Sequence, residues 1–180
     1  MIEIREISSL TDTQVSDLAD MLVRIVKSGA SIGWLDTPDP VAARLYWLSV
    51  IRPDNVLLVA EEDGHVIGTA QLELAQRENS RHRAEVNKVL VRPDRQGEGI
   101  GKLLMDAVER AARERGRTLL HLDTDQADIA NAFYLRCGYT PIGTIPNWAR
   151  SGRDGTLHGT TFYYKLLDSD RKVSPNTGRR

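Results

Sequence analysis

The sequence predicts a mixed α/β fold with the element order β-α-α-β-β-β-α-β-α-β-β. Short runs rich in β-branched residues are interspersed with segments whose apolar residues recur at helical spacing. Asp63-Gly64 separates two of the apolar runs, which is typical of a two-residue β-hairpin turn. A glycine-rich hexapeptide, residues 96–101, joins a strand pattern to a long amphipathic helix pattern.

The N-terminal part of the chain begins with one strand and one helix. Alternating isoleucines predict a strand at residues 2–7. Thr11 and Gln14 form a capping box for an amphipathic helix that ends before Gly29. The loop that follows, residues 29–34, is too apolar for a simple spacer, so we expect it to line a pocket.

A second helix is predicted to begin near Asp36 or Thr37, either of which can cap it, with Pro38 in its first turn. Its apolar positions continue up to the next Arg-Pro pair. Two antiparallel strands, residues 56–61 and 66–74, then flank the Asp-Gly turn.

The rest of the chain alternates strands and helices. Thr124 or Asp125 is expected to cap the second of these helices, which ends before Gly138. Residues 168–180 are polar and contain proline and glycine, so we expect a disordered tail after a domain of residues 1–167. The elements predicted here are a strand at 85–91, a helix from 100 that closes at 116, a strand at 118–122, a helix around 129–134, and strands at 139–145 and 157–167.

Composition limits the classes of function. The chain has 180 residues, of which 41% are hydrophobic and 27% charged, as in ordinary globular domains. A formal net charge of −1 argues against nucleic acid as the main partner, because such binding relies on a basic surface. Neither a signal-like apolar segment nor a stretch of about 20 apolar residues is present, and the chain has one cysteine. We therefore expect a cytoplasmic protein without a membrane partner.

The hexapeptide Gln96-Gly97-Glu98-Gly99-Ile100-Gly101 lies where a strand leads into a helix. The first amides of a helix lack intrahelical partners and carry the positive end of the helix dipole. Three glycines let a diphosphate approach the bare backbone, so the segment is predicted to bind an anion. The spacing excludes two common phosphate loops. A P-loop would need glycine at position 96 and Ser or Thr at 103, and a dinucleotide fingerprint would need glycine at 102.

The remaining pattern, Gln/Arg-x-x-Gly-x-Gly/Ala, with the strand before it and Phe133-Tyr134-x-x-x-Gly138-Tyr139 after it, resembles the GNAT family of N-acetyltransferases over residues 85–140. This resemblance implies a mostly antiparallel central sheet, flanked by helices, whose strands on either side of the long helix splay apart and admit acetyl-CoA as cosubstrate. The cofactor-binding residues that it implies are Val89, Leu90, Val91, Gln96, Gly97, Glu98, Gly99, Ile100, Gly101 and Asn131.

Transfer of an acyl group from a thioester to an amine needs a base for the amine and an acid for the departing thiolate. Tyr134 falls on the tyrosine of the family pattern and is the expected acid, although a tyrosine that only packs is the alternative. Glu85 begins the cofactor strand and Asp123 follows the next one, so both are candidate bases. Their plainer interpretations are a solvated carboxylate and a helix cap, and the residues alone do not decide between these.

A narrower resemblance is to the tabtoxin-resistance branch of the family, whose members acetylate a β-lactam amino-acid toxin. It covers roughly residues 20–167 and includes Ser28 to Trp34 and Leu157 to Thr160. It implies catalytic roles for Glu85, Asp123 and Tyr134. It also implies a small amine acceptor that contacts Ser31, Trp34 and His158.

Alternatives remain for the acceptor and for the class of protein. A protein N-terminus, a polyamine or an aminoglycoside is a possible acceptor, and a non-catalytic acyl-CoA-binding module is a different class. The four histidines are scattered without metal-ligand spacing, so no metal site is expected. Cys137 lacks a visible activating partner and is expected to be a small buried residue. Members of the family often pair, which leaves a homodimer open.

Overall fold

The computed structural model describes residues 1–30 and 32–167. Ser31 and the tail 168–180 lie outside the described residues. The observed element order is the one predicted from the sequence. The elements are β1 (Glu3–Ile7), α1 (Asp12–Lys27), α2 (Pro40–Ser49), β2 (Asn55–Glu62), β3 (His65–Leu74), β4 (Arg83–Val91), α3 (Ile100–Glu114), β5 (Leu119–Asp125), α4 (Ala130–Arg136), β6 (Thr140–Arg150) and β7 (Leu157–Leu166), with 3-10 turns at Glu78–Ser80 and Pro93–Arg95.

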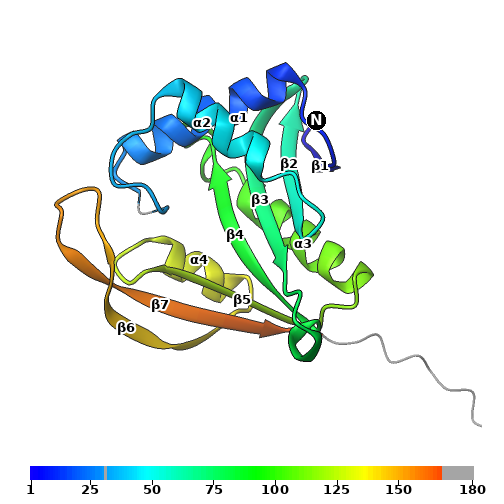
Figure 1. Cartoon of the computed structure of the whole chain (residues 1–180), viewed down its shortest axis with the longest axis vertical. Helices are drawn as coiled ribbons and strands as arrows, with labels where there is room; N and C mark the ends of the chain where they lie inside the picture. Colours follow the sequence, from blue (N-terminus) through cyan, green and yellow to red (C-terminus); the bar gives the residue numbers. More distant parts are fainter. Residues whose placement is uncertain (31, 168–180) are drawn as a thin grey trace, which may run out of the picture.

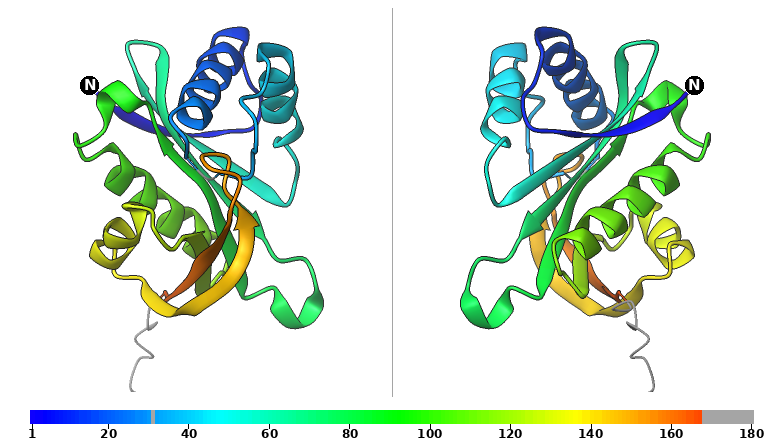
Figure 2. Two further views of the ribbon diagram at one scale, coloured as in Figure 1. Left: turned by 90° about the vertical axis from the view of Figure 1, so that its left-hand side faces the viewer. Right: turned by 90° about the vertical axis from the view of Figure 1, so that its right-hand side faces the viewer.

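Seven strands form one sheet in the order β1-β2-β3-β4-β5-β7-β6. Neighbouring strands are antiparallel except for β4 and β5, which are parallel because α3 crosses over between them. Figure 2 shows α1 and α2 on one face of the sheet and α3 and α4 on the other. We call these the α1 face and the α3 face.

Each face has its own apolar core. On the α3 face, side chains of α3 such as Leu104 and Val108 pack on Leu72 and Val86. On the α1 face, Leu18 and Leu22 of α1 and the fully buried Trp47 of α2 pack on β2 and β3. The alternation of side chains along each strand therefore decides which face a polar residue joins.

Local signals explain most of the boundaries. Thr11 and Gln14 form the predicted capping box at the start of α1. Asp63 and Gly64 both have positive φ, at 52° and 80°, as the predicted hairpin turn requires. Gly116, with φ of 66°, follows the end of α3.

Three boundaries differ from the prediction. The cap of α2 is Asp39, whose Oδ1 accepts from the amides of Val41 and Ala42, so the helix begins later than Asp36 or Thr37. The proline in the first turn is Pro40 and not Pro38, because Pro40 directly follows the cap and takes the N1 position. The other two differences are that β5 continues past 122 to Asp125, and that β6 continues past 145 to Arg150 through irregular pairing.

Candidate active site

The sheet opens between its two parallel strands. Strands β4 and β5 pair at only three positions, from Arg83 with Leu119 to Glu85 with His121, and then diverge. Figure 1 shows the two arrows separating beyond this point. We call this divergence the fork. The splayed strands expected from the sequence are confirmed, and the β5-facing backbone of residues 86–91 has no ladder partner among the described strands.

A β-bulge in β4 changes which side chains face the α1 side. The register with β3 shifts between Thr69 and Gln71, and Lys88 has a φ of 48°. Val86 and Val89 both pack against the core of the α3 face although they are three residues apart. The two residues between them, Asn87 and Lys88, therefore both belong to the α1 face. Nothing in the sequence signals this bulge.

The hexapeptide forms a turn whose backbone amides are available to a ligand. No backbone N–H group of residues 96–101 has a hydrogen-bond partner among residues 1–30 and 32–167. Gly97 and Gly99 have φ of 87° and 83°, in the left-handed region, and an added Cβ on either would meet nothing. These glycines are therefore required by backbone conformation, and the surface that they leave bare fits a diphosphate.

Ion pairs and one close contact fix this turn. Arg95 is bound by Glu62 of β2 at 2.7 Å and by Glu98 at 2.8 Å, and both bonds raise its pKa. A Cβ on Gly101 would come within 3.2 Å of the Phe133 ring. The last glycine of the motif thus lets α3 approach α4 closely.

The two candidate bases lie on the α1 face at the fork. Glu85 pairs with His121 across β4 and β5, and Asp123 follows two residues later on the same side of β5. Burial raises the pKa of Glu85, and the charge of Asp123 raises it further. Burial also raises the pKa of Asp123, with Lys88 opposing the shift. Burial lowers the pKa of Lys88, which both carboxylates counteract. The three groups therefore form one coupled cluster.

Tyr134 approaches from the α3 face. Its side chain is 8% exposed and packs among the rings of Phe133, Tyr139 and Tyr163. Burial raises its pKa, and Asp123 is among the charges that contribute. The Tyr134 hydroxyl has no hydrogen-bond partner among the described residues. Its oxygen is not fully buried, unlike that of Tyr139, so a ligand can reach it. It is therefore a neutral donor that can bind a ligand.

The side chain of Asn131 is already engaged within the protein. Its Nδ2 donates to the carbonyl oxygens of Asp125 at 2.9 Å and Asp128 at 2.6 Å, and its Oδ1 accepts from the Tyr163 hydroxyl at 2.7 Å. These bonds hold the turn between β5 and α4. The N-cap position of α4 is Ile129 and not Thr124 or Asp125, and the Asp128 carboxylate accepts from the amide of Ala130, the first residue of the helix. A cofactor contact by Asn131 stays a prediction.

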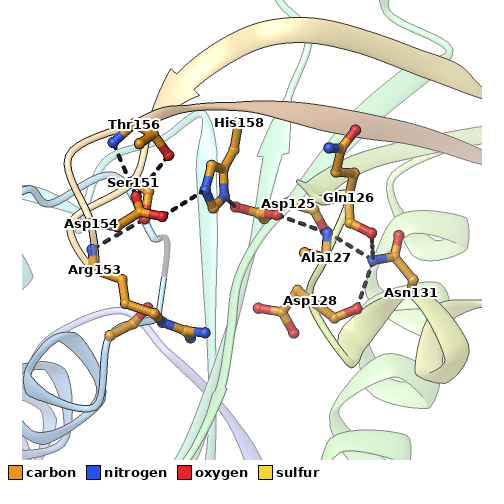
Figure 3. A network of polar contacts seen from close by, with 11 residues as sticks. Asp125, Gln126, Ala127, Asp128, Asn131, Ser151, Arg153, Asp154, Thr156 and His158 are labelled. Atoms are coloured by element: carbon orange, nitrogen blue, oxygen red, sulfur yellow. Dashed lines mark hydrogen bonds and ion pairs between the residues drawn. The ribbon is translucent and has the colours of Figure 1, made fainter.

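Two of the three expected acceptor-binding residues are described: Trp34 lies on the loop between α1 and α2, and His158 lies on β7. Ser31 is outside the described residues. Trp34 packs edge-on against Tyr46 of α2, with ring centroids 6.0 Å apart. His158 binds Asp125 through Nδ1 at 2.7 Å and Asp154 through Nε2 at 3.4 Å (Figure 3). The bond to Asp125 is the main reason that the pKa of His158 is raised.

Two loops far apart in the sequence meet beside this network. Arg153 donates to the carbonyl oxygen of Gly29 at 3.1 Å. A Cβ on Gly152 would lie 2.6 Å from the carbonyl oxygen of Leu35, so only glycine fits there. The β6–β7 turn, residues 151–156, is therefore in contact with the loop between α1 and α2 at Gly29 and at Leu35. Sequence reasoning missed Lys88, Arg153 and the Asp125–His158 pair, because each depends on long-range register.

The described part of the chain has neither a membrane-spanning helix nor a metal-binding cluster. No helix there is long and apolar enough to cross a membrane. No cluster of three His, Cys, Asp or Glu residues there could hold a metal ion.

Comparison with known proteins identifies the family. The model of the acetyltransferase (GNAT) family matches residues 19–139. An uncharacterized N-acetyltransferase in the hisH-hisA intergenic region of Azospirillum brasilense is 32% identical over 125 residues, which cover 68% of this chain and 74% of that protein.

Solved structures share the fold. The ribosomal-protein-alanine N-acetyltransferase of Brucella melitensis has a TM-score of 0.77 at 24% identity and covers 92% of this chain and 99% of its own. YncA of Salmonella typhimurium, solved with its cofactor acetyl-CoA, has a TM-score of 0.75 at 21% identity and covers 98% and 99%. The fork, the bare amides before α3 and the family match agree: this chain belongs to the GNAT family of acetyl-CoA-dependent N-acetyltransferases.

Proposed function

We propose that the chain transfers acetyl directly to the amine of a small, amino-acid-like acceptor, and that a β-lactam amino-acid toxin is one candidate. Acetyl-CoA supplies the activated acyl group as a thioester. The unpartnered amides of residues 96–101 and the backbone of Val89 to Val91 are the groups that fit its diphosphate and pantetheine parts. The acceptor reaches the thioester from the α1 face.

One observation carries this proposal: the fork brings together groups from opposite faces of the sheet. Glu85 and Asp123 lie on the α1 face, whereas Tyr134 belongs to the core of the α3 face. Burial is the main reason that the pKa values of Glu85 and Tyr134 are raised, and the charge of Asp123 raises both further, which supports their placement around one opening. An intact sheet would separate them.

The roles follow from the protonation states. Glu85 or Asp123 accepts a proton from the acceptor ammonium, directly or through water, which frees the nitrogen lone pair for attack on the thioester carbon. A raised carboxylate pKa makes this transfer easier near neutral pH. As the carbon–sulfur bond breaks, the Tyr134 hydroxyl gives its proton to the sulfur. Burial keeps this hydroxyl neutral and able to donate.

A polycationic acceptor is the second candidate, because Glu73 lies directly opposite Glu85 and adds a third carboxylate to the α1 face. Arg52 binds Glu73 at 3.1 Å, however, and neutralises much of this charge. The balance favours an acceptor with a single amine.

Calorimetric titration with coenzyme A, followed by assays of acetyl-CoA consumption, tests the proposal. The acceptor panel contains amino acids, β-lactam antimetabolites, polyamines, aminoglycosides and a peptide with a free N-terminus. We expect saturable coenzyme A binding and turnover with amino-acid-like members. Turnover confined to polyamines, aminoglycosides or the peptide would contradict the proposed acceptor class, and the absence of coenzyme A binding would contradict the cofactor site.

A further inference from the structure

The position of Lys88 depends on the bulge in β4. Regular alternation after Val86 would turn Asn87 to the α1 face and Lys88 into the apolar core under α3. The extra residue at the bulge keeps Lys88 on the α1 face instead. Its φ of 48° is costly for a residue other than glycine, and such strain persists only where the surrounding structure enforces it.

The Lys88 ammonium group lies between the fork and the loop after α1. A Cβ on Gly33 would be 3.9 Å from its Nζ, so the side chain extends toward this loop. Lys88 is half-buried, and no carboxylate among the described residues lies within the 4.0 Å of an ion pair. Glu85 and Asp123 influence it electrostatically without touching it. A half-buried ammonium in this position lacks the direct partner that would offset its lost hydration.

Aromatic rings lie near these charges. Trp34 packs edge-on against Tyr46 of α2. Phe162 of β7 lies opposite Asp123 in the sheet register. Trp148 of β6 packs edge-on against the Phe162 ring, with ring centroids 5.1 Å apart. The α1 face at the fork therefore offers a cation and two carboxylates beside apolar rings.

We propose that Lys88 is a specificity-determining residue that binds the carboxylate of an α-amino-acid acceptor while Glu85 and Asp123 face its amine. This inference rests on the proposed function and adds to it a requirement for a carboxylate next to the reacting nitrogen. A zwitterion fits the cluster because its two charges match the separated charges of Lys88 and the carboxylates. A simple amine would leave Lys88 without a partner.

Other charged groups facing this site do not replace Lys88. Arg83 contributes to the pKa of Glu85 and His121, but it lies at the closed end of the fork, where β4 and β5 are still paired. Arg52 is bound to Asp54 and Glu73. Burial lowers the pKa of His121, which keeps it neutral near pH 7. Lys88 is thus the cation available to an acceptor carboxylate among the described residues at the fork.

The test compares amines that differ only in the carboxylate. Each of the proteinogenic amino acids and its decarboxylated amine is assayed with saturating acetyl-CoA, for the wild type and for Lys88→Met. We expect Lys88→Met to lower kcat/KM for amino acids by about 10- to 100-fold, mainly through KM, because a charge-assisted hydrogen bond is lost. For the decarboxylated amines, kcat/KM should change less than about twofold.

Two further variants separate recognition from folding. Lys88→Arg keeps the charge and should restore most of the amino-acid activity. Arg24→Met removes one positive charge from an exposed surface pair on α1 and should leave both substrate classes unchanged. Coenzyme A binding by calorimetry confirms that each variant is folded.

Equal losses for both members of a pair, with a shift of the pH profile, would overturn the inference, because Lys88 would then act on Glu85 and Asp123. Wild-type preference for decarboxylated amines would also overturn it. Coenzyme A binding without turnover of amino acids or of their decarboxylated amines would also overturn the inference. The proposed function would then still allow other amino-acid-like amines as acceptors. The absence of coenzyme A binding in the wild type would remove the proposed function itself.

Discussion

At the scale of single residues, substitutions of two tyrosines in the core of the α3 face test whether Tyr134 is the acid. Tyr134→Phe removes a hydroxyl without a protein partner and keeps the ring packing, so stability should change little. Without the proton donor, kcat should fall by about 100-fold or more, whereas affinity for acetyl-CoA should stay similar. Tyr139→Phe is the matched control. Its buried hydroxyl has no partner, so its removal should leave kcat unchanged and raise stability by about 1 kcal/mol. Unchanged turnover in Tyr134→Phe would contradict the role of acid.

The coupled carboxylates make a prediction about pH. A base acts when deprotonated, so kcat/KM rises as pH increases through its pKa. Because the charge of Asp123 raises the pKa of Glu85, Asp123→Asn should move the acid limb of the remaining activity to lower pH. The measurement is kcat/KM against pH for the variant and the wild type. An unmoved limb would mean that Glu85 does not control the reaction.

Candidate site residues could be predicted from the sequence where a short local motif marks them. Tyr134 and the three glycines of the hexapeptide follow from short motifs and their spacing. Lys88 could not be found, because the bulge that directs it arises from pairing with β3. Glu85 and Asp123 were found as candidates from strand ends, but their coupling follows from strand pairing.

At the scale of elements, boundaries were predicted well where one local signal has no competitor nearby. The capping box of α1 is such a signal, and so is the Asp-Gly turn. The start of α2 was placed too early because Asp36, Thr37 and Asp39 can all cap a helix, and only the structure shows that Asp39 does so. The extension of β6 could not be predicted, since its pairing with β7 is irregular.

The β6–β7 turn should respond to pH through His158. Its pKa is raised in the folded protein, so its contribution is fully present below the ordinary histidine pKa of about 6.5 and is lost as pH rises through the higher folded value. A neutral ring cannot donate to Asp125 and Asp154 together. Hydrogen exchange at residues 151–158, corrected for intrinsic rates, should therefore be better protected at pH 6 than at pH 9.

His158→Gln should abolish this pH dependence. His65→Gln is the control, because His65 pairs with Asp17 on the exposed side of α1, away from the turn. Equal protection of the turn at both pH values in the wild type would show that His158 does not hold it.

At the scale of the whole molecule, the fork divides the sheet into two parts. Strands β1–β4 with α1–α3 form one part, and β5–β7 with α4 form the other. Backbone pairing joins them at three positions only. The contact of Gly101 with Phe133 adds a second connection through α3 and α4. Arg153 of the β6–β7 turn adds a connection through its bond to the carbonyl oxygen of Gly29. The opening that suits a cofactor therefore leaves few strand-to-strand bonds, and side-chain contacts hold the two parts together.

Lys165 of β7 provides a further connection, and its loss should be costly. Its ammonium binds the nearly buried Glu109 of α3 and donates to the carbonyl oxygen of Cys137 at 2.7 Å, so one side chain ties β7 to α3 and to the end of α4. Lys165→Met would leave the Glu109 carboxylate with Arg113, at 3.4 Å, as its remaining cation. We expect a loss of about 2 kcal/mol in the free energy of unfolding, measured by urea denaturation, which is less than for a buried charge left without any partner. Lys102→Met removes an exposed pair with Asp106 and should cost less than about 1 kcal/mol. Similar losses in the two variants would show that Lys165 does not join the two parts of the sheet.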